Sequence, residues 1–313
     1  MGFLVRIAIM GVGGLGSYFG GRLANAGADV AFLARGRNLA ALRNEGLRIR
    51  SQLGDLHLAK VVATDDPAAL GRVDLVIIAV KLWDTQEAAR EIAPLVERGA
   101  SLVSFQNGVE KDDVLRKEFG DAPVMGGVCY VAASLAEPGV VAHTGKMQRL
   151  VFGEYDGTRS ARADAFLEAC RRAEIDAELS RDIKRAIWEK FVFLVGLSGA
   201  TASMRAPIGP IRSNPRSRAF LLDAMREVVA VGRALGVTLA EDFAEDRLAF
   251  CDGLPAEMVA SMYADLVAGR RLESPWLSGA IVKLGAASSI PTPVNRAIDD
   301  ILALYVEGRG EKP

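Results

Sequence analysis

Residues 5–26 read VRIAIMGVGGLGSYFGGRLANA. The apolar run over residues 5–10 predicts a buried strand, and a helix-like stretch ending near Ala26 follows almost at once. Between them, Gly11-Val12-Gly13-Gly14-Leu15-Gly16 matches G-x-G-x-x-G in the strand–turn–helix context that this pattern requires. The stretch therefore predicts the first β-α unit of a dinucleotide-binding sheet.

Each glycine of this loop has a predicted task. Gly11 makes the tight turn, Gly13 lets the backbone approach a pyrophosphate, and Gly16 lets helix and strand pack closely. The helix N-terminus then faces the anion. We take all six residues of the loop as cofactor-binding, against the alternative of a glycine-rich turn without a ligand.

The end of the second predicted strand indicates which dinucleotide is bound. Folds that prefer NAD place Asp or Glu there, about twenty residues beyond the glycines, against the ribose 2′-hydroxyl. This chain has Leu33-Ala34-Arg35-Gly36-Arg37 instead. Arg35, with Arg37 as a second candidate, suits a 2′-phosphate, so NADPH is favoured over NADH. The alternative is a pair of solvated arginines.

The first half alternates short apolar runs with Ala-rich amphipathic stretches, which predicts a parallel, doubly wound, Rossmann-type α/β sheet. The predicted strands of this part are residues 5–10, 29–33, 73–80 and 102–105. A hairpin is expected from residues 47–49 and 56–62, and an antiparallel end of the sheet from 124–132, 140–143 and 150–152. A helix over 159–173 and a strand over 177–179 complete this half.

From Asp182 onward the pattern is helical, with breaks at residues 207–215, 253–255 and 290–293. We therefore expect an NADP-binding domain over residues 1–181 and an all-helical substrate and catalytic domain over 182–313. Apolar helices such as residues 220–231 suit packing within the chain or across a homodimer.

Composition excludes several classes of function. The 38 basic and 39 acidic residues give a net charge of -1, which does not favour nucleic acid or an anionic membrane. Three scattered cysteines suit reduced, buried thiols, and two histidines leave little with which to build a metal centre. His143 is interpreted as a structural turn histidine. Without a signal peptide or a bilayer-length apolar run, a soluble cytoplasmic protein is expected.

Three further side chains stand where a cofactor and substrate are expected to meet. Lys81 and Asn107 each follow a predicted strand, at the edge of the sheet where ligands gather. Lys190 lies among bulky apolar neighbours on a predicted helix, where burial lowers the pKa of an ammonium group and suits it to donate a proton. Taken singly, each also fits a plain surface or turn position.

Several ordered motifs together resemble those of the ketopantoate reductases (2-dehydropantoate 2-reductases) along nearly the whole chain. Besides the glycine loop, they are Ala79-Val80-Lys81, Gln106-Asn107-Gly108-Val109, Trp188-Glu189-Lys190-Phe191, Ser261-Met262-Tyr263-Ala264-Asp265 and Arg271-Leu272-Glu273. The resemblance implies reduction of ketopantoate to pantoate, a step of pantothenate biosynthesis, with NADPH.

The resemblance also implies residue roles. Lys190 would be the general acid, Arg35 and Lys81 would contact NADPH, and Asn107 would lie near the nicotinamide. Ser261 would bind the substrate carboxylate, and Glu273 would contact both cofactor and substrate. Ser198 would be a further substrate contact.

The chain departs from the family pattern at three positions. Pantoate-forming members carry asparagines where this chain has Leu194, Ser198 and Ile208. Because sites built on hydrogen bonds to a hydroxyl discriminate strongly against analogues that lack it, the substrate is expected to be more apolar near C3 or to lack the 4-hydroxyl. The alternatives are a relative that reduces another 2-oxo acid, a dehydrogenase working in the oxidative direction, and a non-catalytic NADP(H) sensor.

Overall fold

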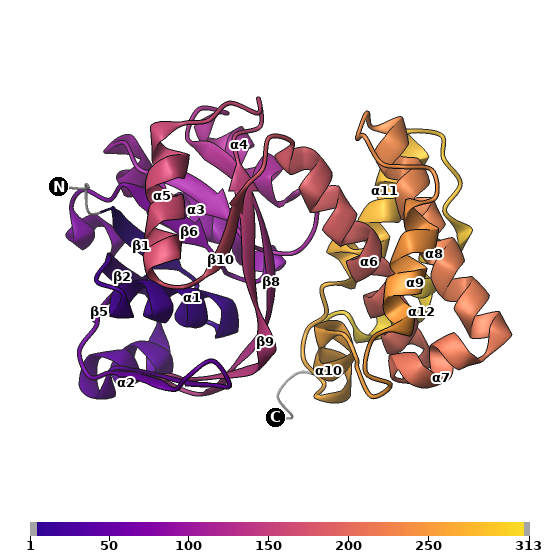
Figure 1. Cartoon of the computed structure of the whole chain (residues 1–313), viewed down its shortest axis with the longest axis horizontal. Coiled ribbons are helices and arrows are strands. Elements are labelled where there is room, and N and C mark those ends of the chain that lie inside the picture. The colour runs from indigo at the N-terminus through magenta and orange to yellow at the C-terminus, as the bar shows by residue number, and fades with distance from the viewer. Residues whose placement is uncertain (1–4, 310–313) are drawn as a thin grey trace. The chain divides into compact units, whose positions relative to one another are not determined.

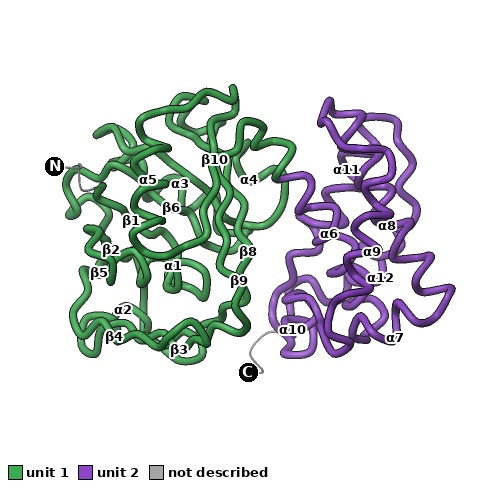
Figure 2. The backbone as a smooth tube through the Cα atoms, viewed as in Figure 1, with its two compact units in different colours: residues 1–186 green, residues 187–313 purple. Residues whose placement is uncertain are grey.

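The computed structural model describes residues 5–309, and the chain forms two compact units, residues 1–186 and 187–313 (Figure 2). Unit 1 is a sheet with helices on both faces, and unit 2 is helical (Figure 1). The predicted fold class, a Rossmann-type sheet followed by helices, is confirmed.

Unit 1 alternates strands and helices in the order that the sequence predicts. Its elements are β1 (Arg6–Met10), α1 (Gly14–Asn25), β2 (Asp29–Leu33), α2 (Gly36–Glu45), β3 (Leu47–Ser51), β4 (Leu56–Leu58), β5 (Val62–Thr64), η1 (Pro67–Leu70), β6 (Leu75–Ile78), η2 (Leu82–Asp84), α3 (Thr85–Glu97), β7 (Ser101–Ser104), α4 (Lys111–Phe119), β8 (Val124–Glu137), β9 (Val140–Gly153), α5 (Ala161–Arg172) and β10 (Asp176–Leu179).

In the described residues, the strands of unit 1 follow the order β4-β3-β9-β8-β7-β6-β1-β2-β5, with β10 beside β9. The stretch from β8 through β7, β6, β1 and β2 to β5 is parallel throughout. After β1 the chain moves to one side, to β2, and later returns to the other side of β1, to β6. In open α/β sheets such a reversal marks the crevice where ligands bind, so β1 and β6 point to the site.

The strand prediction differs from the structure in two places. The predicted strand over residues 56–62 is two strands, because β4 pairs with β3 whereas β5 pairs with β2. Residues 140–143 and 150–152 belong to one continuous strand, β9. The intervening residues 144–149 are mostly polar and were not expected to be extended, but antiparallel pairing with β8 satisfies the backbone there for part of their length.

Alternate side chains of β1 pack into two separate hydrophobic cores, one on each face of the sheet. Ile7 and Ile9 pack on the face covered by α1 and α5, while Ala8 and Met10 pack on the face covered by α3 and α4. Successive residues of a strand point to opposite faces, and every residue from 7 to 10 is buried. This double burial explains why β1 is a continuous apolar run.

His143 lies in strand β9 and not in a turn, so the predicted location was wrong. Its Nδ1 is 2.8 Å from Ser51 Oγ, its Nε2 is 3.0 Å from the Met147 carbonyl oxygen, and its ring lies tilted against the Tyr18 ring with centroids 4.3 Å apart. Its two ring nitrogens therefore contact the end of β3 and the backbone of β9, which is a structural role.

Unit 2 is made of helices throughout its described part. Helix α6 (Ile183–Met204) begins just before the division between the units; the elements that follow are α7 (Ile208–Ser213), α8 (Pro215–Ala234), α9 (Phe243–Asp252), α10 (Ser261–Val267), η3 (Ser274–Trp276), α11 (Ser278–Ala287), α12 (Pro293–Leu302) and η4 (Ala303–Tyr305).

The apolar face of α8 packs inside unit 2. Leu221, Met225 and Val228 are fully buried, and α8 lies against α7, α9, α11 and α12. The apolar stretch over residues 220–231, which the sequence left open between the chain's own core and a dimer contact, is therefore largely used in the chain's own core.

The three cysteines, Cys129, Cys170 and Cys251, are buried, as predicted for structural thiols. Burial raises the pKa of the Cys251 thiol to about 11, which makes it a poor nucleophile at neutral pH. Across residues 5–309, none of the helices combines the length and apolar character that crossing a bilayer demands.

A fall in pH should lower the free energy of unfolding of unit 1, because it protonates Glu154, the residue that follows β9. Arg162 of α5 holds its carboxylate with two hydrogen bonds of 2.6 and 2.7 Å, and Ser160 donates a third. Burial alone would raise the pKa of Glu154, but these bonds outweigh it and hold the pKa below its ordinary value. The stabilisation is therefore present above the unfolded pKa of about 4.3 and is lost as pH falls through the folded pKa.

We expect Glu154→Gln to lower the free energy of unfolding at pH 7 by on the order of 2 kcal/mol and to flatten its pH dependence below about pH 4.5. Urea unfolding at several pH values measures both. Glu168→Gln, in an exposed ion pair with Arg172 on α5, is the matched control. An equal loss in both variants would contradict this account.

Candidate active site

The glycine loop lies at the β1–β6 reversal point. Gly11 has a φ of +100°, and a Cβ there would lie 2.5 Å from the Val80 backbone nitrogen. A Cβ on Gly16 would lie 2.1 Å from the Gly11 carbonyl oxygen, so only glycine lets α1 start this close to β1. Gly13, in contrast, has no heavy atom within 4 Å of the Cβ position. Its backbone is open to a ligand.

Gly14 has a role that the sequence pattern did not indicate. A Cβ at this position would lie 2.2 Å from the Ala133 carbonyl oxygen of β8. The first turn of α1 therefore packs directly on the antiparallel pair of strands β8 and β9, which comes from a distant part of the sequence.

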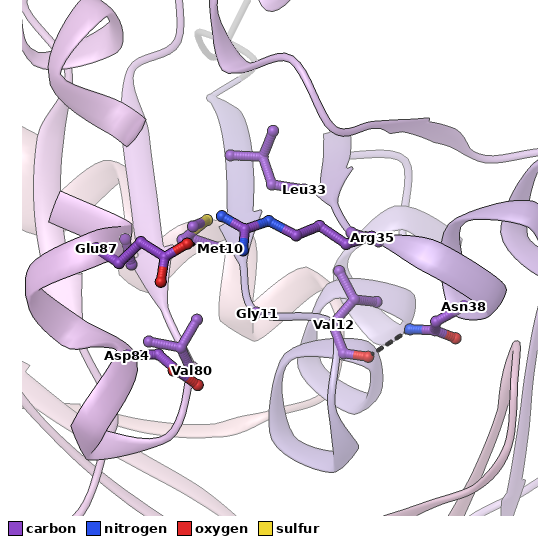
Figure 3. Close-up of a pocket in the computed structure, with 11 residues that line it drawn as sticks. Met10, Gly11, Val12, Leu33, Arg35, Asn38, Val80, Asp84 and Glu87 are labelled. Carbon is purple, nitrogen blue, oxygen red and sulfur yellow. Dashed lines mark hydrogen bonds and ion pairs between the residues drawn. The ribbon is translucent and has the colours of Figure 1, made fainter. Parts of the chain in front are cut away.

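A cavity of about 250 Å³ opens beside the loop (Figure 3). Its polar rim brings together residues from four segments: the loop itself, the end of β2 with the start of α2, η2 and the first turn of α3. The residues that matter below are Gly11, Val12, Arg35, Asn38, Asp84 and Glu87.

Arg35 extends along this cavity from the N-terminus of α2, as Figure 3 shows. Its Nη1 lies 2.9 Å from Oε1 of Glu87 on α3, and its Nη2 forms a second ion pair with Glu91, also on α3. Arg37 is exposed and is not among the residues that line the cavity. The structure thus places one of the two predicted arginines at the cavity.

Asn38 is a residue of this region that sequence reasoning missed. Its Nδ2 donates to the Val12 carbonyl oxygen at 2.8 Å, and its Oδ1 accepts from the Gly139 backbone N–H at 2.8 Å. One side chain therefore ties the glycine loop to the β8–β9 turn. An asparagine directly after Arg37 belongs to no sequence motif considered above, so only the fold reveals this bridge.

Lys81 and Asn107 follow β6 and β7 on the same edge of the sheet, as predicted. Lys81 is exposed and its Nζ lies 5.6 Å from the centre of the Trp83 ring. Asn107 is half-buried. The loops that carry them are held together by the residue before Asn107.

That residue is Gln106, whose side chain is almost wholly buried. Its Nε2 donates to the Val80 carbonyl oxygen at 2.9 Å and to Thr85 Oγ1 at 2.8 Å, and its Oε1 accepts from Ser104 Oγ at 2.9 Å. Gln106 therefore links the loop after β7 to the loop after β6, which fixes the backbone on either side of Lys81.

A buried ion pair anchors the far end of the same loop. Lys111 Nζ donates to the Ser104 carbonyl oxygen at 2.8 Å and to Asp112 Oδ2 at 2.9 Å, and Tyr155 donates to the same carboxylate oxygen at 2.6 Å. Burial lowers the pKa of Lys111, against the opposing effect of Asp112. The pair holds the start of α4 and has no place in the sequence-predicted site.

In unit 2, Lys190, Leu194 and Ser198 recur every four residues along α6 and so lie along one side of it. Lys190 and Leu194 are half-buried, and Ser198 is 1% exposed. Within the described residues, the Ser198 hydroxyl has no hydrogen-bond partner. A buried hydroxyl without a partner is costly, and such groups call for an explanation.

The other two predicted residues of unit 2 differ in burial. Ser261 is the exposed first residue of α10, whereas Glu273, just before η3, is only 8% exposed. Without the resemblance, Glu273 would be expected in solvent. Ile208 is fully buried at the start of α7.

No group of three or more His, Cys, Asp or Glu side chains within residues 5–309 is arranged to hold a metal ion. The polar groups that line the cavity are instead glycine backbone, the Asn38 amide, the Arg35 guanidinium and the Asp84 and Glu87 carboxylates. The open glycine backbone and the guanidinium suit an organic anion with a phosphate group.

A sheet with a glycine loop at its reversal point and an arginine on the adjoining cavity is typical of dinucleotide-binding oxidoreductases. Comparisons with known proteins make the family specific. The sequence model "Ketopantoate reductase PanE/ApbA" matches residues 7–157, and its C-terminal counterpart matches residues 182–306. The chain belongs to the ketopantoate reductase family, as the sequence motifs indicated.

Individual relatives are similar to this chain over nearly its full length. The 2-dehydropantoate 2-reductase of Archaeoglobus fulgidus is 36% identical over 94% of this chain and 95% of its own. The structure of 2-dehydropantoate 2-reductase from Geobacter metallireducens, 32% identical, superposes with a TM-score of 0.89 over 96% of this chain and 99% of that one. D-mandelate dehydrogenase in complex with NADH shares the fold at 19% identity, with a TM-score of 0.87 over 96% and 98%.

The loop geometry predicts opposite outcomes for two Gly→Ala changes. Gly16→Ala places a methyl group against the Gly11 carbonyl and should cost on the order of 3 kcal/mol of unfolding free energy. Gly13→Ala meets nothing in the protein and should cost about 0.5 kcal/mol or less, yet weaken dinucleotide binding because the methyl group stands where the pyrophosphate approaches.

Urea unfolding and a fluorescence titration with NADPH measure the two effects. Equal stability losses in the two variants, or undiminished NADPH affinity in Gly13→Ala, would show that the loop is not arranged in this way.

Proposed function

We propose that the chain catalyses the NADPH-dependent reduction of a small 2-oxo acid to the corresponding 2-hydroxy acid. The observation that carries the proposal is the cavity beside Gly11–Gly16, with open backbone at Gly13 and the Arg35 guanidinium on its rim. The overall change is 2-oxo acid plus NADPH plus a proton, giving 2-hydroxy acid and NADP⁺.

The residues present fit the cofactor. The N-terminus of α1 offers backbone N–H groups to the pyrophosphate, and Arg35 offers a planar pair of donors to the 2′-phosphate. When bound, the reduced nicotinamide supplies the hydride for the carbonyl carbon. Lys81 and Asn107 are proposed to contact the cofactor from the loops that Gln106 holds together.

Lys190 is proposed as the general acid. A carbonyl oxygen gains negative charge as the carbon is reduced, so a cation beside it stabilises the transition state and supplies the proton. Ser261 is proposed to hold the substrate carboxylate. Glu273, an unusually buried carboxylate, is proposed to accept hydrogen bonds from cofactor and substrate hydroxyls.

Two substrates are weighed for this site. Ketopantoate, reduced to pantoate in pantothenate biosynthesis in the cytoplasm, is supported by the names of the relatives. An analogue without the 4-hydroxyl is favoured by Leu194 and Ile208, which stand where the pantoate-forming members have asparagine. Ser198 alone of these three positions retains a hydrogen-bonding group, and its buried hydroxyl is a candidate partner for the substrate.

We expect Lys190→Ala to reduce kcat for 2-oxo acid reduction by about a hundredfold or more, because a positioned acid contributes 10²–10⁴. NADPH oxidation followed at 340 nm measures the rate. Lys184→Ala, an exposed lysine on the same helix, is the matched control and should retain activity. Full activity in Lys190→Ala would remove Lys190 from the mechanism, and NADPH binding without turnover of any 2-oxo acid would favour a sensor.

The substrate is tested with a matched pair. Ketopantoate and 3,3-dimethyl-2-oxobutanoate differ only by the 4-hydroxyl, and we expect kcat/KM to be higher for the compound without it, by about tenfold or more. Leu194→Asn should shift the preference toward ketopantoate. A strong preference of the unmodified protein for ketopantoate would instead assign it the pantoate-forming reaction.

A further inference from the structure

We propose that Glu87 determines dinucleotide specificity: its carboxylate competes with the 2′-phosphate of NADPH for Arg35, and Glu91 assists it. The protein should therefore prefer NADPH less strongly than a site in which no carboxylate pairs with the arginine. This inference rests on the proposed function, because it concerns the cofactor cavity of the same reaction.

The contact is direct and lies at the cavity. Arg35 Nη1 is 2.9 Å from Glu87 Oε1, and both residues line the cavity beside Gly11. Figure 3 shows the guanidinium and the Glu87 carboxylate pointing toward one another from opposite walls. The two side chains come from different β-α connections, the one after β2 and the one after β6, which meet where the sheet reverses.

A second carboxylate strengthens the hold on Arg35. Glu91 lies one helical turn after Glu87 on α3, and it pairs with Nη2 while Glu87 pairs with Nη1. Two carboxylates thus pair with the two Nη groups of the guanidinium, which are the donors that a phosphate would use. A third carboxylate, Asp84, also lines the cavity.

The charge balance of the cavity is therefore unlike that of a dedicated phosphate site. The Arg35 guanidinium is opposed by Glu87 in the cavity lining and by Glu91 beside it, whereas a 2′-phosphate adds up to two further negative charges. An incoming phosphate has to displace the carboxylates from Arg35 or remain close to them. Either course weakens NADPH binding relative to a site in which Arg35 stands alone.

The same carboxylate suits NADH. Enzymes that prefer NAD bind the ribose 2′-hydroxyl with an acidic acceptor. That acceptor usually follows the second strand, where this chain has Arg35; here Glu87 brings a carboxylate to the same cavity from α3. The cavity thus holds an acceptor for the hydroxyl and a donor for the phosphate side by side.

The expected effect is a few-fold change in affinity. Arg35 is 59% exposed and Glu87 is 60% exposed, so water screens the pair. Removing the Glu87 charge should tighten NADPH binding by about fivefold at low salt, and the gain should shrink as salt rises.

Dissociation constants for NADPH and NADH, measured by fluorescence titration of the whole chain, test the proposal without relying on turnover. The variants are Glu87→Gln, Glu91→Gln and Arg35→Gln, with Glu97→Gln as the control because it removes the same charge from an exposed position at the other end of α3. Glu87→Gln should bind NADPH about fivefold more tightly and NADH no more tightly, and Glu91→Gln should show a smaller shift of the same sign. Arg35→Gln should lower NADPH affinity to that for NADH.

Unchanged or weaker NADPH binding in Glu87→Gln would overturn the proposal, as would an equal gain in Glu97→Gln. If the unmodified protein binds both dinucleotides while the Glu87 substitution leaves their ratio unchanged, only this inference fails. If the unmodified protein binds neither, the proposed function fails and this inference fails with it.

Discussion

The close approach of α1 to β1 is the constraint on which unit 1 depends. Because Gly16 has no side chain, the helix begins against the Gly11 carbonyl. Because Gly11 has a positive φ and no side chain, the chain turns close to Val80, just after β6. These two contacts bring the N-terminus of α1 to the place where the order of the parallel strands reverses. A ligand with a phosphate group then meets backbone N–H groups that need no further arrangement.

Around this loop, individual polar side chains join segments that are far apart in sequence. Asn38 ties the loop to the β8–β9 turn, Gln106 ties the connections after β6 and β7 to each other, and the buried Lys111–Asp112 pair anchors the second of these. Such networks favour one arrangement of the site because a buried polar group that loses its partner is costly. The loops that carry Lys81 and Asn107 are therefore held before any ligand arrives.

The sequence predicted what depends on local pattern and missed what depends on distant partners. The glycine loop, the parallel strands and the helical second half follow from periodicity and glycine spacing. The extent of β9 was misjudged because residues 144–149 are mostly polar and are extended through pairing with a neighbouring strand. Asn38 and Glu87 were missed because an Asn or Glu on a predicted helix has no signature until the fold sets it opposite Val12 or Arg35. The roles of Lys190, Ser261 and Glu273 rest on family resemblance, to which the structure adds the burial of Glu273.

The most direct test of this account is hydrogen–deuterium exchange of the whole chain with and without saturating NADPH. The account predicts slower amide exchange over residues 11–17, where backbone N–H groups would bind the pyrophosphate, and in the connection after β6, while the β3–β4 hairpin remains unchanged. Unaltered exchange over residues 11–17 at a saturating concentration would contradict the assignment of this loop as the dinucleotide site.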